Sequence, residues 1–320
     1  MNKMNANLQK NVRAVKNILS AEDILVFHFE TTDGAACAAI YADGICDKDL
    51  LGEQVIRPLS SDKRGDSIDE VAKKLTSPEV KKEKSIQAIA DEVLSGNTAL
   101  IVDGLDSALI IGVKKIPVRT ITEPPTSIAV KGPREGFIED IKTNMALLRK
   151  RLKTGDLQFE TLTVGTRSKS MIAVCYLNGI SDLKVKKQIV DRLKRIEIDG
   201  IPDASYIAKF LAKKPYSMFK QVGTTEKPDI LAAKMLEGRI GIFVDGSPIA
   251  LTLPYILVED FQSVQDYLVS PYRATVSRLL RLVSLVIALL LPAYYVAAQL
   301  FKLQLLPLGL LMTISGNVRD

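Results

Sequence analysis

Few side chains in this sequence are of a type and spacing that could perform catalysis. Its single histidine, His28, lies in an apolar segment typical of a strand, which favours a structural role over a catalytic base or a metal ligand. Serine and cysteine nucleophiles need a neighbouring group to activate them, and a second histidine is missing. There is no Walker loop, no GxGxxG motif after a strand and no zinc-type pair of Cys or His. We therefore predict no metal, no cofactor and no enzymatic activity.

Two carboxylates remain as catalytic candidates, Asp103 and Asp245. Each stands in a Val-Asp-Gly sequence between two apolar runs, a pattern that predicts the turn of a β-hairpin. The turn by itself explains these residues. A carboxylate-based hydrolase, which would require paired acids in one pocket, is the less favoured alternative.

Two short stretches are candidates for binding or contact. GTRSKS at 165–170 carries Arg167 and Lys169 among glycine and hydroxyls and could bind an anion through backbone donors, although a solvated turn with charged tips is the more common outcome. The second stretch is KGPREGF, where a charged pair stands between a proline and a glycine at the start of a helix. For it we predict a contact between domains or subunits, made by Lys131, Gly132, Pro133, Arg134, Glu135, Gly136 and Phe137.

Alternating short strands and helices predict an α/β fold. Apolar residues at helical spacing indicate a helix over 6–20, and β-favouring runs at 24–30 and 35–41 indicate two strands that precede a helix at 47–58. The order then returns. MIAVCYLNG at 171–179 resembles ACAAIYADG at 36–44, and RIGIFVDGSPIALTLP at 239–254 resembles NTALIVDGLDSALIIG at 97–112. We predict two similar α/β subdomains, with generic hairpin chemistry as the alternative explanation.

A helix follows the KGPREGF stretch, with Ile138, Ile141, Met145, Leu148 and Leu152 on one face. Acidic residues lie in its first turn and Arg149, Lys150, Arg151 and Lys153 in its last, so the charges oppose the helix dipole. A well-capped connecting helix is favoured over a phosphate or nucleic-acid site.

The C-terminal region differs from the rest in composition. Leu282–Phe301 holds twenty residues without a formal charge, which matches the roughly 20 residues that a membrane-spanning helix needs. We predict a transmembrane helix, with a buried soluble helix as the alternative, and we assign Arg278, Arg281, Pro292, Tyr294 and Tyr295 to this membrane anchor. A second apolar run after Lys302 is expected to be the start of another membrane segment, cut short.

The charge balance excludes some partners and suggests an orientation. The net charge is +6, but from Pro271 onward five basic residues stand against one acidic residue, which leaves 38 basic and 36 acidic residues in the rest. That balance argues against nucleic acid as a partner. Arg273, Arg278 and Arg281 before the span place the N-terminal region in the cytoplasm by the positive-inside rule. Three cysteines without disulfide spacing fit a reducing compartment.

These patterns predict seven segments along the chain. They are an N-terminal helical extension (1–22), a first subdomain (23–122), a linker with its connecting helix (123–153), a second subdomain (154–258), a juxtamembrane segment (259–278), the transmembrane helix (279–301) and the truncated second segment (303–320).

A set of motifs in the chain resembles the A subunit of the spore germinant receptors, the GerA type of endospore-forming bacteria. The resemblance runs from about Ile24 to Ser315, and GPREGF is its most distinctive element. The motifs that carry it are EPPTSIAVKGPREGF, VGTRSKS, RIEIDGI, KPYSMF, LEGRIGIFVDGSP and LLPAYYVA.

The resemblance implies a non-enzymatic protein of the inner spore membrane with a cytoplasmic region of two subdomains. It further implies a transporter-like B subunit and a lipoprotein C subunit as partners, self-association of A subunits, contact with membrane lipid, and a response to nutrients that releases ions and starts germination. Family members continue through further spans, whereas this sequence stops in the second. The alternative function is a membrane-tethered protein that binds a small ligand in the cleft between the two subdomains.

Overall fold

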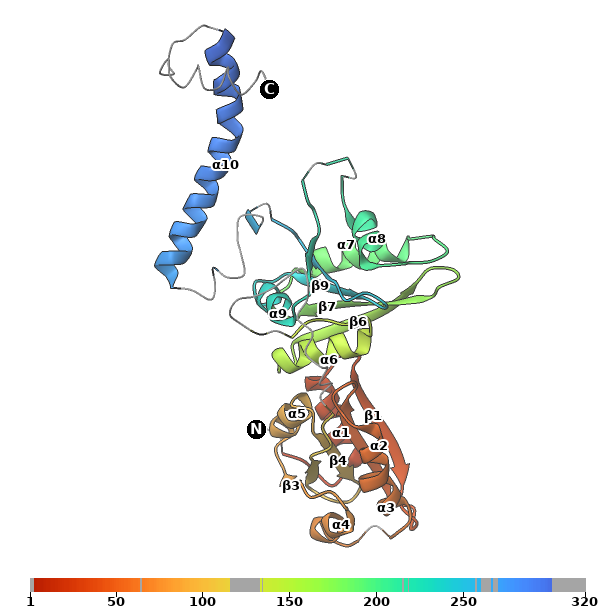
Figure 1. Cartoon of the computed structure of the whole chain (residues 1–320). Helices are drawn as coiled ribbons and strands as arrows, with labels where there is room; N and C mark the ends of the chain where they lie inside the picture. Colours follow the sequence, from red (N-terminus) through yellow and green to blue (C-terminus); the bar gives the residue numbers. More distant parts are fainter. Residues whose placement is uncertain are drawn as a thin grey trace. The chain divides into compact units, whose positions relative to one another are not determined.

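The computed structural model describes residues 3–63, 65–115, 133, 135–214, 216–217, 219–256, 258–259, 266 and 270–300. They form two structural units (Figure 1). One comprises Met1–Ala129 and Pro133–Ile256, and the other comprises Val130–Gly132 and Leu257–Asp320. Four parts of our predictions lie outside the described residues: most of the linker before Pro133, with Lys131 and Gly132; Arg134; residues 260–265 and 267–269 of the juxtamembrane segment; and the second apolar segment at 303–320.

The first unit contains two five-stranded antiparallel sheets. The first sheet consists of β1 (Ile24–Glu30), β2 (Ala36–Ala42), β4 (Thr98–Val102), β5 (Ala108–Ile111) and β3 (Val80–Glu83), in that spatial order. The second consists of β6 (Leu157–Val164), β7 (Ser170–Leu177), β9 (Ile240–Val244), β10 (Ala250–Leu253) and β8 (Gly223–Thr225). Strand for strand, the two orders are the same, which confirms the prediction of two similar α/β subdomains.

Helices cover both faces of the first sheet. Helices α1 (Leu8–Ile18) and α5 (Ile86–Leu94) pack on one face, and α2 (Lys48–Leu51), the π-helical segment η1 (Gly52–Ile56), α3 (Arg57–Ser60) and α4 (Ile68–Lys74) pack on the other. Alternate strand residues point to opposite faces, so Ala38 and Ile40 join the α1 side while Ala39 and Tyr41 join the α3 side. Strands buried on both faces explain the nearly continuous apolar runs in the sequence.

The second half repeats this layering. Helices α6 (Ile141–Arg151) and α9 (Pro228–Leu236) cover one face of its sheet, and α7 (Leu183–Lys194) and α8 (Ala204–Leu211) cover the other. Helix α6 thus corresponds to α1, and most of the buried residues of α6 pack within the core of the second half, while Ala146 joins the core of the first. The segment boundaries that we predicted, which treat 1–22 as an extension and 123–153 as a linker, stay predictions.

In each half, a buried asparagine on the first helix makes the same two hydrogen bonds to the backbone that precedes the helix. The Asn11 side chain accepts a hydrogen bond from the Asn5 N–H (3.1 Å) and donates one to the Asn5 carbonyl (2.6 Å). Asn144, the counterpart on α6, does the same with Ile138 at 2.8 and 2.5 Å. Both asparagines are buried, and a buried polar group is stable only when it is paired. This repeated geometry fixes the position of the chain at the start of the first helix of each half.

The second unit contains helix α10 (Pro271–Leu300). Its residues Pro271–Ala298 are long and apolar enough to cross a membrane, with a mean hydropathy of 2.1. Leucines along it are mostly exposed, including Leu289, Leu290 and Leu291 at more than 60%. An apolar helix left uncovered in this way needs lipid or another apolar partner.

Candidate functional site

Arg149 on α6 joins the two halves of the first unit. Its Nε and Nη2 atoms donate to the two carboxylate oxygens of Asp23 at 2.9 and 2.6 Å, and Asp23 directly precedes β1 of the other half. The remaining donors reach the carbonyls of Thr154 (3.1 Å) and Leu157 (3.2 Å). The guanidinium also lies 5.1 Å from the centre of the Phe159 ring. The result is a bidentate ion pair whose guanidinium also donates two hydrogen bonds to backbone carbonyls.

Both members of this pair are removed from water. The side chains of Arg149 and Asp23 are only 1% and 4% exposed. A buried charge that loses its partner is strongly destabilising, by about 3–5 kcal/mol, because nothing else compensates its lost hydration. Asp23 of the first half therefore compensates the buried charge of Arg149 in the second half, and Arg149 compensates that of Asp23.

Further contacts close the junction around the pair. Glu22 accepts hydrogen bonds from the Thr161 N–H (2.9 Å) and hydroxyl (2.6 Å), and Lys142 lies 3.3 Å from Asp43. The backbones also approach closely: a Cβ on Gly155 would stand 2.8 Å from the Ile18 carbonyl oxygen. Only glycine fits at that contact.

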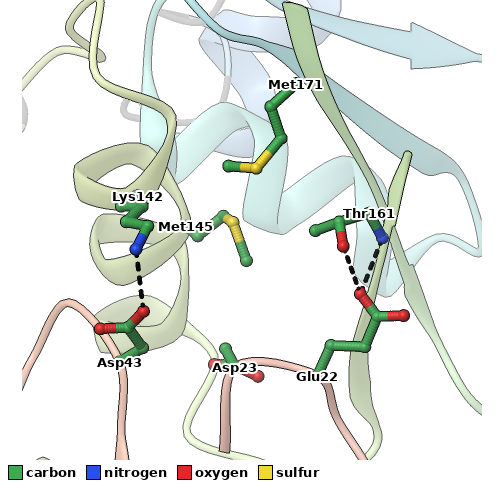
Figure 2. Close-up of a pocket in the computed structure, with 7 residues that line it drawn as sticks. All are labelled: Glu22, Asp23, Asp43, Lys142, Met145, Thr161 and Met171. Atoms are coloured by element: carbon green, nitrogen blue, oxygen red, sulfur yellow. Dashed lines mark hydrogen bonds and ion pairs between the residues drawn. The ribbon is translucent and has the colours of Figure 1, made fainter. Parts of the chain in front are cut away.

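A pocket of about 190 Å³ opens at this junction (Figure 2). The first half contributes carboxylate side chains to its lining, and the second half contributes two methionines. The residues that line it are Glu22, Asp23, Asp43, Lys142, Met145, Thr161 and Met171. Its volume lies below the roughly 300 Å³ at which pockets for drug-sized ligands begin, so only a small metabolite would fit.

The charges around the pocket are set by neighbours. Burial alone would raise the pKa of Asp43, but hydrogen bonds and charge from Lys48 and Lys142 outweigh it and hold that pKa below its usual value. Asp43 is therefore ionised at neutral pH. The lining thus combines three carboxylate side chains with one lysine, Lys142, whose side chain is 58% exposed.

Among the residues of the predicted contact stretch, Pro133 and Gly136 are half-buried, while Glu135 and Phe137 make contacts within the second half. Glu135 pairs with Lys150 and Arg151 at 2.9 Å each. Burial would raise its pKa, but these two cations hold the pKa of Glu135 below its usual value. Phe137 is buried, with its ring 4.9 Å from that of Phe243. A contact to another domain or subunit at this stretch stays a prediction.

The loop that carries Arg167 and Lys169 already uses its backbone donors. The N–H of Thr166 donates to the Ile198 carbonyl (2.9 Å), and those of Arg167 and Ser168 donate to the Asp199 carbonyl at 3.0 and 2.9 Å. The Arg167 side chain is 86% exposed. In this state the loop holds the RIEIDGI segment rather than offering its amides to an anion.

The carboxylates considered for catalysis have structural roles. Asp103 accepts a hydrogen bond from the N–H of Leu8 (2.9 Å), and Asp245 accepts one from the N–H of Ile141 (3.4 Å). Each aspartate thus joins its hairpin turn to the first helix of its half. The glycines that follow, Gly104 and Gly246, have φ of +81° and +82°, which favours glycine in the turn.

The other groups considered for chemistry do not line the junction pocket. His28 is exposed on β1. The three cysteines are buried, and burial raises the pKa of the Cys46 and Cys175 thiols, which keeps them protonated. Within the described residues, no group of three or more His, Cys, Asp or Glu side chains is placed to hold a metal ion.

The residues assigned to the membrane anchor lie on α10. Arg281 and Arg278 pair with Asp266 at 2.6 and 3.4 Å, and Pro292 lies inside the helix. Tyr294 and Tyr295 are 56% and 46% exposed.

The junction itself was missed by sequence reasoning. Arg149 was treated as one of several basic residues in the last turn of a connecting helix. Its spacing held a signal, because it follows Met145 by four residues and precedes Leu152 by three, which puts it at the apolar face. Asp23 and Lys142 offered no comparable signal, because their partners are distant in sequence.

The chain matches a known protein family over most of its length. The family model "Bacillus/Clostridium GerA spore germination protein" matches residues 12–320. Spore germination protein KA of Bacillus subtilis (strain 168) is 35% identical over 318 residues, which cover 97% of this chain and 58% of that protein. Spore germination protein A1 of the same strain is 32% identical over 310 residues, covering 97% of this chain and 62% of that protein.

A solved structure shares the fold. The N-terminal domain of the A subunit of the Bacillus megaterium spore germinant receptor GerK3 matches with a TM-score of 0.62 and 27% identity, over 80% of this chain and 98% of that one. The class is therefore that of the germinant receptor A subunits. The chain belongs to the GerA family of spore germination proteins, and it spans about three fifths of the length of the two curated relatives described above.

Removal of the Arg149 charge tests the junction. Arg149→Met should lower the free energy of unfolding of residues 1–256 by about 3–5 kcal/mol, because Asp23 is left buried and unpaired. The segment is suited to the test because all four core clusters lie within it and the matching domain of the relative was crystallised. Urea unfolding followed by circular dichroism gives the value.

The matched control is Arg151→Met, two residues away, which breaks only a surface pair and should cost less than about 1 kcal/mol. The double variant Asp23→Asn with Arg149→Met should lose less stability than the two single losses added together. Equal costs for Arg149→Met and Arg151→Met, or simple additivity of the Asp23 and Arg149 changes, would contradict the account of the junction.

Proposed function

We propose that this chain is, or is part of, a membrane-anchored A subunit of a nutrient germinant receptor, which senses or transmits the nutrient signal and helps to trigger ion release and spore germination. The observation that carries the proposal is the GerA family match, which runs from α1 through the apolar helix. The role is non-enzymatic: Asp103 and Asp245 act in helix entry, and relatives are named as germination proteins.

We infer the location and the partners from the same family. Helix α10 anchors the chain in the inner spore membrane, and three arginines on its N-terminal side favour a cytoplasmic, spore-core orientation of the two α/β halves. The partners are a transporter-like B subunit, a lipoprotein C subunit and further A subunits.

Gene deletion tests this function. Spores of the source strain that lack the gene should germinate more slowly with at least one nutrient, measured as loss of optical density across a panel of amino acids and sugars. The wild-type gene should restore the rate. An allele with Leu289→Arg and Leu290→Arg should not, since each central arginine costs about 2.5–3.5 kcal/mol on insertion.

The matched allele, Leu289→Ile with Leu290→Ile, should restore germination because it keeps the span apolar. Two results would count against the proposal. One is normal germination of the deletion mutant with every nutrient when full-length paralogues are also absent. The other is full complementation by the arginine allele.

The junction pocket favours a second candidate function, the binding of a small ligand by this chain. The pocket lies between the two halves, where ligand sites commonly form, and it combines apolar methionines with a cation and carboxylates. A zwitterion such as an amino acid matches that mixture, because Lys142 can pair with its carboxylate and Glu22 with its ammonium.

Calorimetric titration of residues 1–256 with amino acids and sugars tests this second function. At least one compound should bind, and Lys142→Met should weaken its binding about tenfold or more through loss of a charge-assisted contact. Lys153→Met, an exposed lysine outside the pocket, should leave binding unchanged. Absence of binding at millimolar concentrations, or equal effects of the two substitutions, would remove this candidate without affecting the receptor assignment.

A further inference from the structure

Exposed aromatic rings and lysines gather on α8 and on the loop that follows it. Tyr216 is 98% exposed and Phe219 is 66% exposed, although both types are usually at least partly buried. Tyr206 and Phe210, four residues apart on α8, are 45% and 44% exposed. We name this set the lysine–aromatic patch and define it by Tyr206, Lys209, Phe210, Lys213, Lys214, Tyr216, Phe219 and Lys220.

The loop is held in shape rather than merely left exposed. The Gln221 side chain accepts hydrogen bonds from the N–H groups of Lys213 (2.8 Å) and Lys214 (3.0 Å) and donates one to the Lys214 carbonyl (2.6 Å). Ser217 bonds both the N–H and the carbonyl of Phe219. Helix α8 and strand β8 flank this loop. Its backbone is braced while its aromatic rings face solvent.

The charged residues of α8 and the loop that follows it are all basic. From Ala204 to Thr225 the sequence contains four lysines and neither Asp nor Glu. Beside the loop lies a hollow of about 270 Å³, and its described lining includes the cations Arg192, Lys213 and Lys220 but no acidic residue. Such a concave, cationic site is suited to a phosphate group.

The composition decides between a lipid surface and a protein partner. Interfaces between proteins are depleted in lysine, and their preferred cation is arginine. Aromatic rings beside lysines are instead typical of the boundary between water and bilayer, where rings enter the headgroup layer and lysines meet anionic lipid. All four cations of the patch are lysines.

We propose that the lysine–aromatic patch docks the second α/β half onto the surface of an anionic phospholipid bilayer. Tyr216 and Phe219 enter the headgroup layer, the lysines meet the anionic surface, and the cationic hollow holds a lipid phosphate. The proposal goes beyond the proposed function, although it draws on membrane anchoring in one respect. Seventeen residues separate Leu253 from Pro271. With α10 in a membrane, as proposed above, this connection tethers the second half to the same membrane.

Vesicle flotation of residues 1–256, which lack α10, tests the docking separately from the anchor. The protein should float with vesicles of phosphatidylcholine that contain 30% phosphatidylglycerol and not with pure phosphatidylcholine, and added salt should weaken its binding. Tyr216→Ser with Phe219→Ser, and separately Lys213→Gln with Lys214→Gln, should each lower the partition coefficient about tenfold or more.

The matched control is Lys10→Gln with Lys16→Gln, which removes the same charge from exposed positions on α1 and should change the partition coefficient less than about twofold. Unchanged thermal melting shows that each variant is folded. Three results would overturn the proposal: no preference for anionic vesicles, equal effects of patch and control substitutions, or self-association through Tyr216 and Phe219 without vesicle binding. None of them bears on germination by the deletion mutant.

Discussion

The ion pair between Arg149 and Asp23 is the constraint on which the first unit depends. Neither side chain can stay charged and buried without the other, and they come from different halves, 126 residues apart in sequence. The arginine also holds the carbonyls of Thr154 and Leu157, which lead into β6. One residue therefore fixes the start of the second sheet against the start of the first. The two halves could move relative to each other only if this ion pair broke or if both of its side chains moved together.

The two halves share the same strand order and the same kind of first helix. They differ in the segments that cover the other face of each sheet. Both halves enter through an asparagine-braced helix and close with a Val-Asp-Gly hairpin. They diverge on the opposite face of each sheet. There the first half carries α2, η1, α3 and α4, and the second carries α7, α8 and the braced loop of the lysine–aromatic patch.

Local patterns predicted most of the fold, because they act over short distances. The Asp103-Gly104 and Asp245-Gly246 turns, the apolar strands and the helix periodicity each reflect neighbours a few residues apart, and the repeat of the whole order predicted two similar halves. The apolar run at 282–301 likewise predicted the single long helix, α10. Family motifs then indicated the kind of protein.

The site could not be predicted in the same way. Arg149 and Asp23, or Glu22 and Thr161, meet only through the packing of two sheets, and no local pattern specifies that packing. Asp103 was explained by its turn, yet its bond to the Leu8 N–H spans 95 residues. Within the KGPREGF stretch, Phe137 contributes to the core of the second half and Glu135 pairs with the last turn of α6, while the predicted contact to another domain or subunit stays a prediction.

Because the buried pair of Arg149 and Asp23 joins them, we expect the two halves to unfold as one cooperative unit. Native-state hydrogen exchange of residues 1–256, read by mass spectrometry over peptides from β2 and β7, tests it most directly. The slowest amides of the two strands should share one opening free energy, equal to that of global unfolding. Two separate opening free energies, with one sheet still protected while the other exchanges, would contradict it.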